Sequence, residues 1–182
     1  MSILPIFIPH AGCPHQCVFC NQKTISGQKL AAVAGAKEQL ARWRSWLRPS
    51  VVNEAAFYGG SFTGLPLELQ EELLALTDAL LAEGFIGSVR LSTRPDYIDE
   101  ERLQLLQCHG VRLVELGVQS LDDRVLAAAE RGHTAAQVAP AVALLKRFGF
   151  QVGLQLMVGM PEQSFDSVQE TVRKAIAMQP DV

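Results

Sequence analysis

The sequence has few cysteines, no strong excess of charge of either sign and no long apolar run. The net charge is -3, so the chain lacks the global basic character of many nucleic-acid-binding proteins, although local basic patches stay open. No stretch is apolar enough to span a bilayer. Residues 1–10 lack a basic n-region and are interrupted by proline, unlike a secretion signal. We therefore expect a cytoplasmic protein without membrane contact.

Four cysteines in a reducing cytoplasm do not predict a disulfide framework. Cys13, Cys17 and Cys20 fall within eight residues, which indicates metal binding instead. Cys108 stands alone near the end of a predicted helix, where we expect a small core residue.

Short apolar runs alternate with longer amphipathic stretches along the whole chain. This rhythm is typical of repeated β-α units around a parallel sheet, and 182 residues of which 48% are hydrophobic favour one globular domain. Helix boundaries are marked by Pro66, Gly84, Asp99 and Ser164. Strands are predicted at 4–9, 51–58, 88–92, 113–118 and 151–158, and helices at 34–47, 66–84, 99–110, 122–130, from 134 onward, and 164–178.

The fourth unit carries two helical pieces. The second piece opens with the capping pair Thr134 and Gln137, and Pro140 should bend it or mark its true start. Residues 179–182 fall where the rhythm calls for a sixth strand, whereas a closed eight-stranded barrel needs roughly 250 residues. We expect an open, partial TIM-like β/α barrel of the α/β class, forming one core domain over 1–182 whose remainder is absent.

The cysteine loop follows the first predicted strand, at the carboxyl end where parallel β/α folds place their chemistry. Three thiolates can bind three corners of an iron–sulfur cubane and leave one iron without a protein ligand. A structural zinc site would want a fourth ligand, and His15 inside the same loop is the only additional one nearby. An iron–sulfur cubane and a structural zinc site both remain possible interpretations of the loop, and the cubane is favoured.

The spacing C-x3-C-x2-C, with Phe19 before the last cysteine, resembles the signature of the radical S-adenosylmethionine (SAM) superfamily. The resemblance implies a 4Fe-4S cluster on Cys13, Cys17 and Cys20. It also implies that the amino and carboxylate groups of SAM chelate the fourth iron, and that Phe19 lies near the adenine.

The ends of the second and third predicted strands carry further candidates. By the same resemblance, Gly59, Gly60 and Ser61 contact the methionine amino group, whereas by themselves they fit an ordinary tight turn equally well. Ser92 takes the place of a ribose-binding residue with Arg94 nearby. Arg94 fits a charge with a salt-bridge partner as well.

The fourth and fifth strand ends complete the set. Glu115, Gly117 and Gln119 share one face of a strand, where they predict a polar ligand or an internal polar network. The resemblance places Met157 and Val158 against the adenine, and a plain core strand would explain them as well. His133 is interpreted as a loop or capping residue.

The order of these strand-end motifs is similar to one branch of the superfamily, which includes the elongator catalytic subunit and the oxygen-independent coproporphyrinogen oxidases. The resemblance implies an enzyme that takes one electron from a flavodoxin- or ferredoxin-type reductant and cleaves SAM to a deoxyadenosyl radical. Its substrate would be tRNA on the elongator-like side and a tetrapyrrole on the other. A non-catalytic module that binds or delivers iron–sulfur, zinc or haem is the alternative of a different class.

Overall fold

The computed structural model describes residues 2–8, 12–20, 32–50 and 52–182. Its centre is a five-stranded parallel sheet whose strands follow one another in sequence order. The strands are β1 (Ile3–Phe7), β2 (Glu54–Tyr58), β3 (Ser88–Thr93), β4 (Val111–Gln119) and β5 (Gln151–Leu156). The expected partial β/α barrel is confirmed, although Pro9 and Val51, which the predicted strands included, lie outside the described residues.

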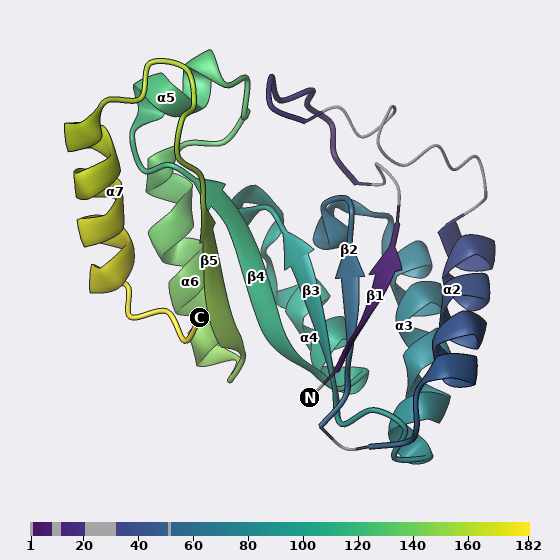
Figure 1. The fold of residues 1–182 in the computed structure, drawn as a ribbon. Helices are drawn as coiled ribbons and strands as arrows, with labels where there is room; N and C mark the ends of the chain where they lie inside the picture. Colours follow the sequence, from purple (N-terminus) through teal and green to yellow (C-terminus); the bar gives the residue numbers. More distant parts are fainter. Residues whose placement is uncertain (1, 9–11, 21–31, 51) are drawn as a thin grey trace.

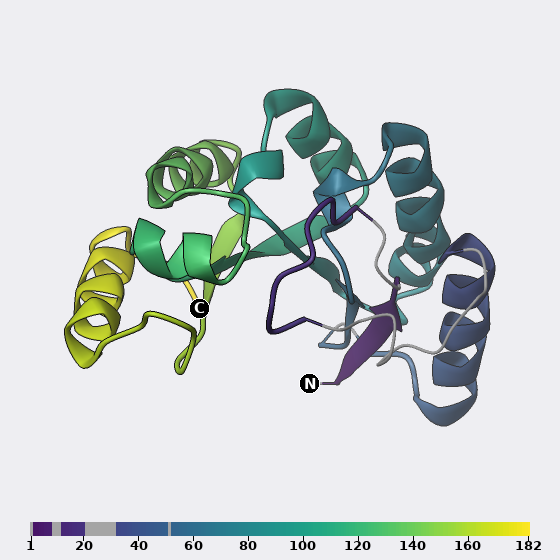
Figure 2. The same ribbon diagram turned by 90° about the horizontal axis from the view of Figure 1, so that it is seen from above.

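Helices cover the outer, convex face of the curved sheet, and the concave face is open (Figures 1 and 2). The short α5 is the exception, since it lies above the carboxyl ends of β4 and β5. The helices are α2 (Ala32–Trp46), α3 (Leu67–Ala82), α4 (Glu100–Cys108), α5 (Asp123–Ala128), α6 (Val138–Arg147) and α7 (Phe165–Ala177), with 3-10 turns η1 (Phe62–Gly64), η2 (Pro95–Tyr97) and η3 (Ala135–Gln137).

Most of the boundary signals act as predicted. The Asp99 side chain accepts from the Arg102 N–H at 3.0 Å, and Ser164 accepts from the Ser167 N–H at 3.1 Å. The Thr134–Gln137 capping box opens η3, which leads directly into α6. Because α6 begins at Val138, Pro140 falls in its first turn, where no helical hydrogen bond is lost.

Two expectations about single elements are wrong. β5 ends at Leu156 rather than at Val158, because the chain turns there toward Gly159, whose φ is +86°. Cys108 is exposed and is not a core residue, because the last position of α4 faces away from the sheet side occupied by Leu103 and Leu106.

The two-residue period of the strands separates an apolar face from a polar one. Residues such as Leu4, Phe57, Leu91 and Leu116 are fully buried in the core between sheet and helices. The alternate positions face the concave side and place polar groups there, among them Glu54, Tyr58, Arg90, Ser92, Glu115 and Gln155. Burying each large apolar side chain contributes about 1.5–3 kcal/mol, so the core fixes which residues the concave face receives.

The far edge of β5 carries the last residues of the chain. The Asp181 N–H donates to the Val152 carbonyl at 2.7 Å, and the Leu154 N–H donates to the Val182 carbonyl at 3.1 Å. Among the helices described, none combines the length and the apolar character needed to cross a membrane.

Candidate functional site

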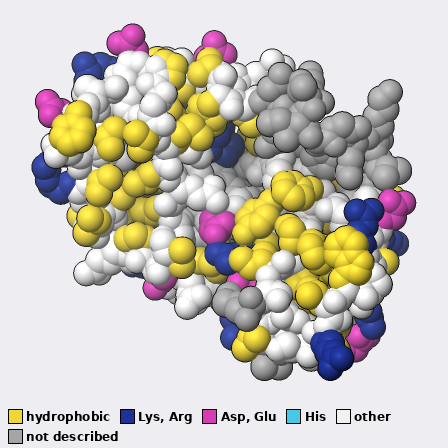
Figure 3. Space-filling view, viewed as in Figure 1, with side chains coloured by type: hydrophobic (Ala, Val, Ile, Leu, Met, Phe, Trp, Pro, Cys, Tyr) yellow, Lys and Arg dark blue, Asp and Glu magenta, His cyan; other side chains and the backbone are white. Residues whose placement is uncertain are grey.

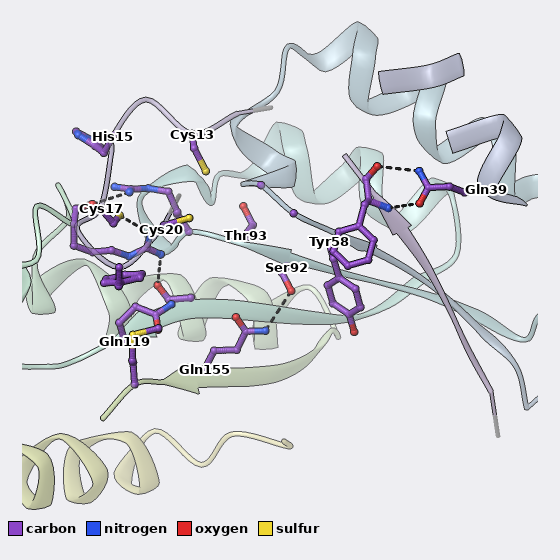
Figure 4. A pocket seen from close by; sticks show the side chains of 18 of the residues that line it. Cys13, His15, Cys17, Cys20, Gln39, Tyr58, Ser92, Thr93, Gln119 and Gln155 are labelled. Atoms are coloured by element: carbon purple, nitrogen blue, oxygen red, sulfur yellow. Dashed lines mark hydrogen bonds between the residues drawn. The ribbon is translucent and has the colours of Figure 1, made fainter. Parts of the chain in front are cut away.

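A cavity of about 770 Å³ lies between the cysteine loop and the concave face, at the carboxyl ends of the strands (Figure 4). Every strand of the sheet or its following loop contributes to the wall. Ten of the thirteen predicted site residues line the cavity: Cys13, Cys17, Phe19, Cys20, Gly59, Gly60, Ser92, Arg94, Gln119 and Met157.

The cysteine loop is held by close backbone contacts. Gly12, at φ +77°, lies so near η1 that an added Cβ would stand 2.1 Å from the Ser61 carbonyl oxygen. The approach is equally close on the η1 side, since a Cβ added at Gly64 would lie 2.2 Å from the Gly12 carbonyl oxygen. The Val18 N–H donates to the Ala129 carbonyl at 3.2 Å. The loop is therefore fixed between the η1 turn and the end of α5.

The three thiols lie together at one cavity, since Cys13, Cys17 and Cys20 all line it. Thiolates are the ligands that iron–sulfur clusters take, so the chemistry of this donor set fits such a cluster. Within the described part of the chain, no group of three or more His, Cys, Asp and Glu side chains is placed as the ligands of a single metal ion.

Two buried arginines lie beside the thiols. The pKa of Cys13 is raised by burial, and a backbone hydrogen bond at Ser61 and the charges of Arg131 and Arg94 offset only part of this effect. Arg131 Nη1 donates to Cys17 Sγ at 3.6 Å, and its Nη2 donates to the Gly117 carbonyl at 2.5 Å. The two arginine charges therefore oppose the effect of burial on Cys13, and the thiolate is the form that binds metal.

Arg94 and Arg131 differ in how many of their guanidinium N–H groups are already hydrogen-bonded. Arg94 donates to both Asp96 oxygens at 2.9 and 2.8 Å and to the Arg131 carbonyl at 2.6 Å, so its guanidinium is an anchor of the site wall. Burial opposes ionisation of Asp96, but the hydrogen bonds and the charge of Arg94, together with a backbone hydrogen bond, outweigh it and lower the pKa of that carboxyl. Arg131 keeps a buried Nε–H without a partner among the described residues.

The glycine segment after β2 presents its backbone to the cavity. Gly59 has φ +94°, which a side chain would disfavour, and Gly60 follows it at the wall. Ser61 does not reach the cavity. It is buried below, where its Oγ lies 2.9 Å from Thr93 Oγ1 and accepts from the Arg94 N–H at 3.3 Å. Ser61 therefore joins the η1 turn to β3.

A polar network spans the concave face below the cavity. Glu115 forms an ion pair with Arg90 at 2.6 Å and accepts from Ser92 at 3.0 Å and from Gln155 Nε2 at 3.1 Å. Arg90 also pairs with Glu54 at 3.2 Å. Glu115 does not itself line the cavity, whereas Ser92 and Gln155 do.

Phe19 and Met157 lie at the α5 side of the cavity. Both pack against a small cluster formed by Val125, Ala129 and Met160, separate from the main core. The structure does not bring Val158 to them, since its side chain is 76% exposed beyond the end of β5. The cluster gives an apolar wall on one side of the thiols.

His133 is buried near Arg131, Arg94 and Asp96, and neither of its ring nitrogens has a hydrogen-bond partner among the described residues. Burial and the charges of Arg131 and Arg94 lower the pKa of His133 to about 4. His133 lies in the loop between α5 and η3, as expected, and its ring is a buried, neutral packing group there.

The sequence interpretation missed several wall residues. Tyr58 and Gln155 follow the same inward alternation as residues that were identified, so strand period alone would have found them. Thr93 is different, because it alternates with the inward-facing Ser92 and reaches the wall from the last position of β3. Arg131 follows α5, and only the fold brings it to Cys17. Phe7, Gln39 and Arg42 line the opposite end of the cavity.

Comparisons with known proteins agree with this arrangement. The family model described as the Radical SAM superfamily matches residues 7–175. A tRNA uridine(34) acetyltransferase of Methanocaldococcus infernus is 25% identical over 100% of this chain and 41% of its own length. An oxygen-independent coproporphyrinogen III oxidase of Synechocystis is 28% identical over 93% of this chain and 38% of its own. The chain thus spans about two-fifths of these relatives.

A solved structure shows the same fold at low identity. Coproporphyrinogen III oxidase from Escherichia coli, described as a radical SAM enzyme, superposes with a TM-score of 0.72 at 21% identity, over 99% of this chain and 42% of that one. Together with the match of the family model to residues 7–175, the fold and the cysteine loop establish that this chain belongs to the radical SAM superfamily.

Proposed function

We propose that this chain binds a 4Fe-4S cluster through Cys13, Cys17 and Cys20 and uses it to cleave SAM reductively. The observation that carries the proposal is that three thiols and polar groups from successive strand ends line one cavity. When bound, the reduced cluster would supply one electron to the sulfonium of SAM, giving methionine and a deoxyadenosyl radical. The electron would come from a flavodoxin- or ferredoxin-type protein.

The wall residues would hold SAM at three places. The Gly59–Gly60 backbone is accessible at the wall without a side chain in between, as close approach of the methionine amino group requires. Ser92 and Gln119 would bind the ribose, and Phe19 and Met157 would pack on the adenine. The unpartnered Nε–H of buried Arg131 is suited to an anionic group such as the methionine carboxylate.

The chain's own residues also protect the reaction. The apolar wall of Phe19, Met157 and Met160 would keep water from the adenosyl group. The N–H···S contact from Arg131 to Cys17 would stabilise added negative charge on the thiolate side of the cluster.

We infer tRNA as the substrate from the order of strand-end motifs and from the tRNA uridine(34) acetyltransferase relatives. A tetrapyrrole is the alternative, because coproporphyrinogen oxidases match comparably well. A reducing cytoplasm would suit a protein that depends on three thiolates.

The test is anaerobic reconstitution with iron and sulfide, followed by electron paramagnetic resonance of the reduced protein with and without SAM. We expect a reduced-cluster signal that changes when SAM is added. Replacing Cys13, Cys17 or Cys20 by serine should abolish the signal, whereas Cys108→Ser, at an exposed position in α4, should preserve it. Stoichiometric zinc without iron would refute the proposal. A cluster that ignores SAM would favour the delivery module.

A further inference from the structure

The end of the cavity farthest from the cysteines is aromatic. Phe7 and Tyr58 are register partners on β1 and β2, with ring centroids 6.4 Å apart and planes inclined by 53°. Phe7 is 51% exposed, and its ring lies against the backbone of Gly59, where an added Cβ would meet Phe7 Cδ1 at 3.2 Å. An open aromatic face thus borders the glycine segment assigned to SAM.

Side chains of α2 hold this face in place. The Phe7 N–H donates to Gln39 Oε1 at 2.8 Å, and Gln39 Nε2 donates to the Phe7 carbonyl at 3.0 Å (Figure 4). Trp43 Nε1 donates to the carbonyl of Pro5 at 3.0 Å, and Pro5 has no N–H to offer. Because these outward backbone groups are already bonded, no further strand can pair with β1 at Pro5 or Phe7. The aromatic end therefore stays accessible.

The helix segment that borders this end is basic within an acidic chain. Residues 32–50 carry four basic side chains and one acidic one, whereas residues 52–182 carry ten basic and eighteen acidic ones. Arg44 is paired with Glu83 at 2.8 Å. Arg42 lines the cavity, is exposed and has no ion-pair partner among the described residues. One helical turn on, about 6 Å along the axis, Trp46 is 66% exposed.

Exposed aromatic faces beside an arginine are the means by which proteins hold single-stranded nucleic acid, with bases stacked on rings and phosphates on cations. The space-filling view shows apolar side chains gathered over the β1–α2 side, next to the hollow that leads to charged groups (Figure 3). An acidic redox protein would also match the charge. Charge pairing with such a protein would not, however, involve the Phe7 ring, which forms part of the cavity wall.

We propose that Phe7, Tyr58, Arg42 and Trp46 form an RNA-binding face, on which a single-stranded segment places one base against Phe7 beside the SAM site. Arg42 binds an adjacent phosphate and Trp46 stacks a flanking base. This inference rests on the proposed function, because it names the surface that presents the substrate to the cofactor cavity.

The test is fluorescence anisotropy of a short labelled oligouridylate over a range of potassium chloride concentrations, with the reconstituted chain and with the apo chain. Phe7→Leu and Trp46→Leu should each weaken binding about 5- to 100-fold, the range for loss of one stacked base. Arg42→Gln should weaken binding and reduce the slope of log affinity against log salt by about 0.7. The matched controls on α7 are Phe165→Leu, where the ring is 76% exposed, and Arg173→Gln, and both should bind as wild type.

Equal affinity of Phe7→Leu, Arg42→Gln and wild type would overturn the inference, as would equal losses in the α7 controls. If Arg42→Gln instead slows reduction of the cluster by flavodoxin and leaves RNA affinity unchanged, the face is a docking surface for a reductant, and the inference is wrong. The paramagnetic response to SAM is recorded on the same variants. Its absence in wild type would refute the proposed function, and its retention in Phe7→Leu would show that only RNA binding was lost.

Discussion

Replacing Gly12 by alanine should release the cysteine loop and prevent cluster binding. The new Cβ would stand 2.1 Å from the Ser61 oxygen, and real Cβ atoms essentially never approach closer than 3.0 Å. The two backbones must therefore separate by about 0.9 Å, the difference of these two distances. Functional geometry must be held to about 0.5 Å, so Cys13, the next residue, would leave its place.

The control isolates this clash from backbone strain. Gly149 has φ +80°, close to the +77° of Gly12, but an added Cβ there has no atom within 4 Å. Left-handed backbone strain should lower the free energy of unfolding of both alanine variants by about 1–2 kcal/mol, measured by urea unfolding of the apo chain. Only Gly12→Ala should also lose iron and sulfide per chain after anaerobic reconstitution. Full iron content in Gly12→Ala would show that the loop is not fixed by its contact with η1.

Two further predictions concern buried groups behind the site. Thr93→Val leaves the Ser61 and Thr63 hydroxyls without their shared partner, so the free energy of unfolding in urea should fall by about 1–3 kcal/mol, and an unchanged value would contradict the assigned hydrogen bonds. The pKa of His133 is about 4 in the folded chain against an ordinary 6.5, so its contribution to stability is complete above pH 6.5 and is lost as pH falls toward 4. Urea unfolding at pH 7 and pH 4.5 should show a loss on the order of 3 kcal/mol at most from this group, and His133→Leu should be less sensitive to the same change. Equal pH dependence of the two proteins would contradict a buried neutral ring.

The sequence by itself determined the architecture and indicated the candidate metal ligands. Strand and helix signals are local, since they depend on apolar period, capping residues such as Asp99 and Ser164, and glycines at helix ends, and all of these act within a few residues. The cysteines share one loop, so their spacing alone indicates a common metal. The order of motifs at strand ends then indicates the family.

Only the tertiary structure decided which polar residues face the cavity. Ser61 follows Gly60 after β2, and Glu115 in β4 is the register partner of Ser92, yet Ser61 is bonded to Thr93 and Glu115 to Arg90. Arg131 reaches Cys17 across 114 positions of sequence, and Gln39 on a helix secures Phe7 on a strand. Such pairings depend on which elements become neighbours when the sheet curves, and no local pattern encodes them. Local patterns in the sequence therefore specified the fold and the proposed ligands, and packing decided which of the remaining polar side chains support the site and which line it.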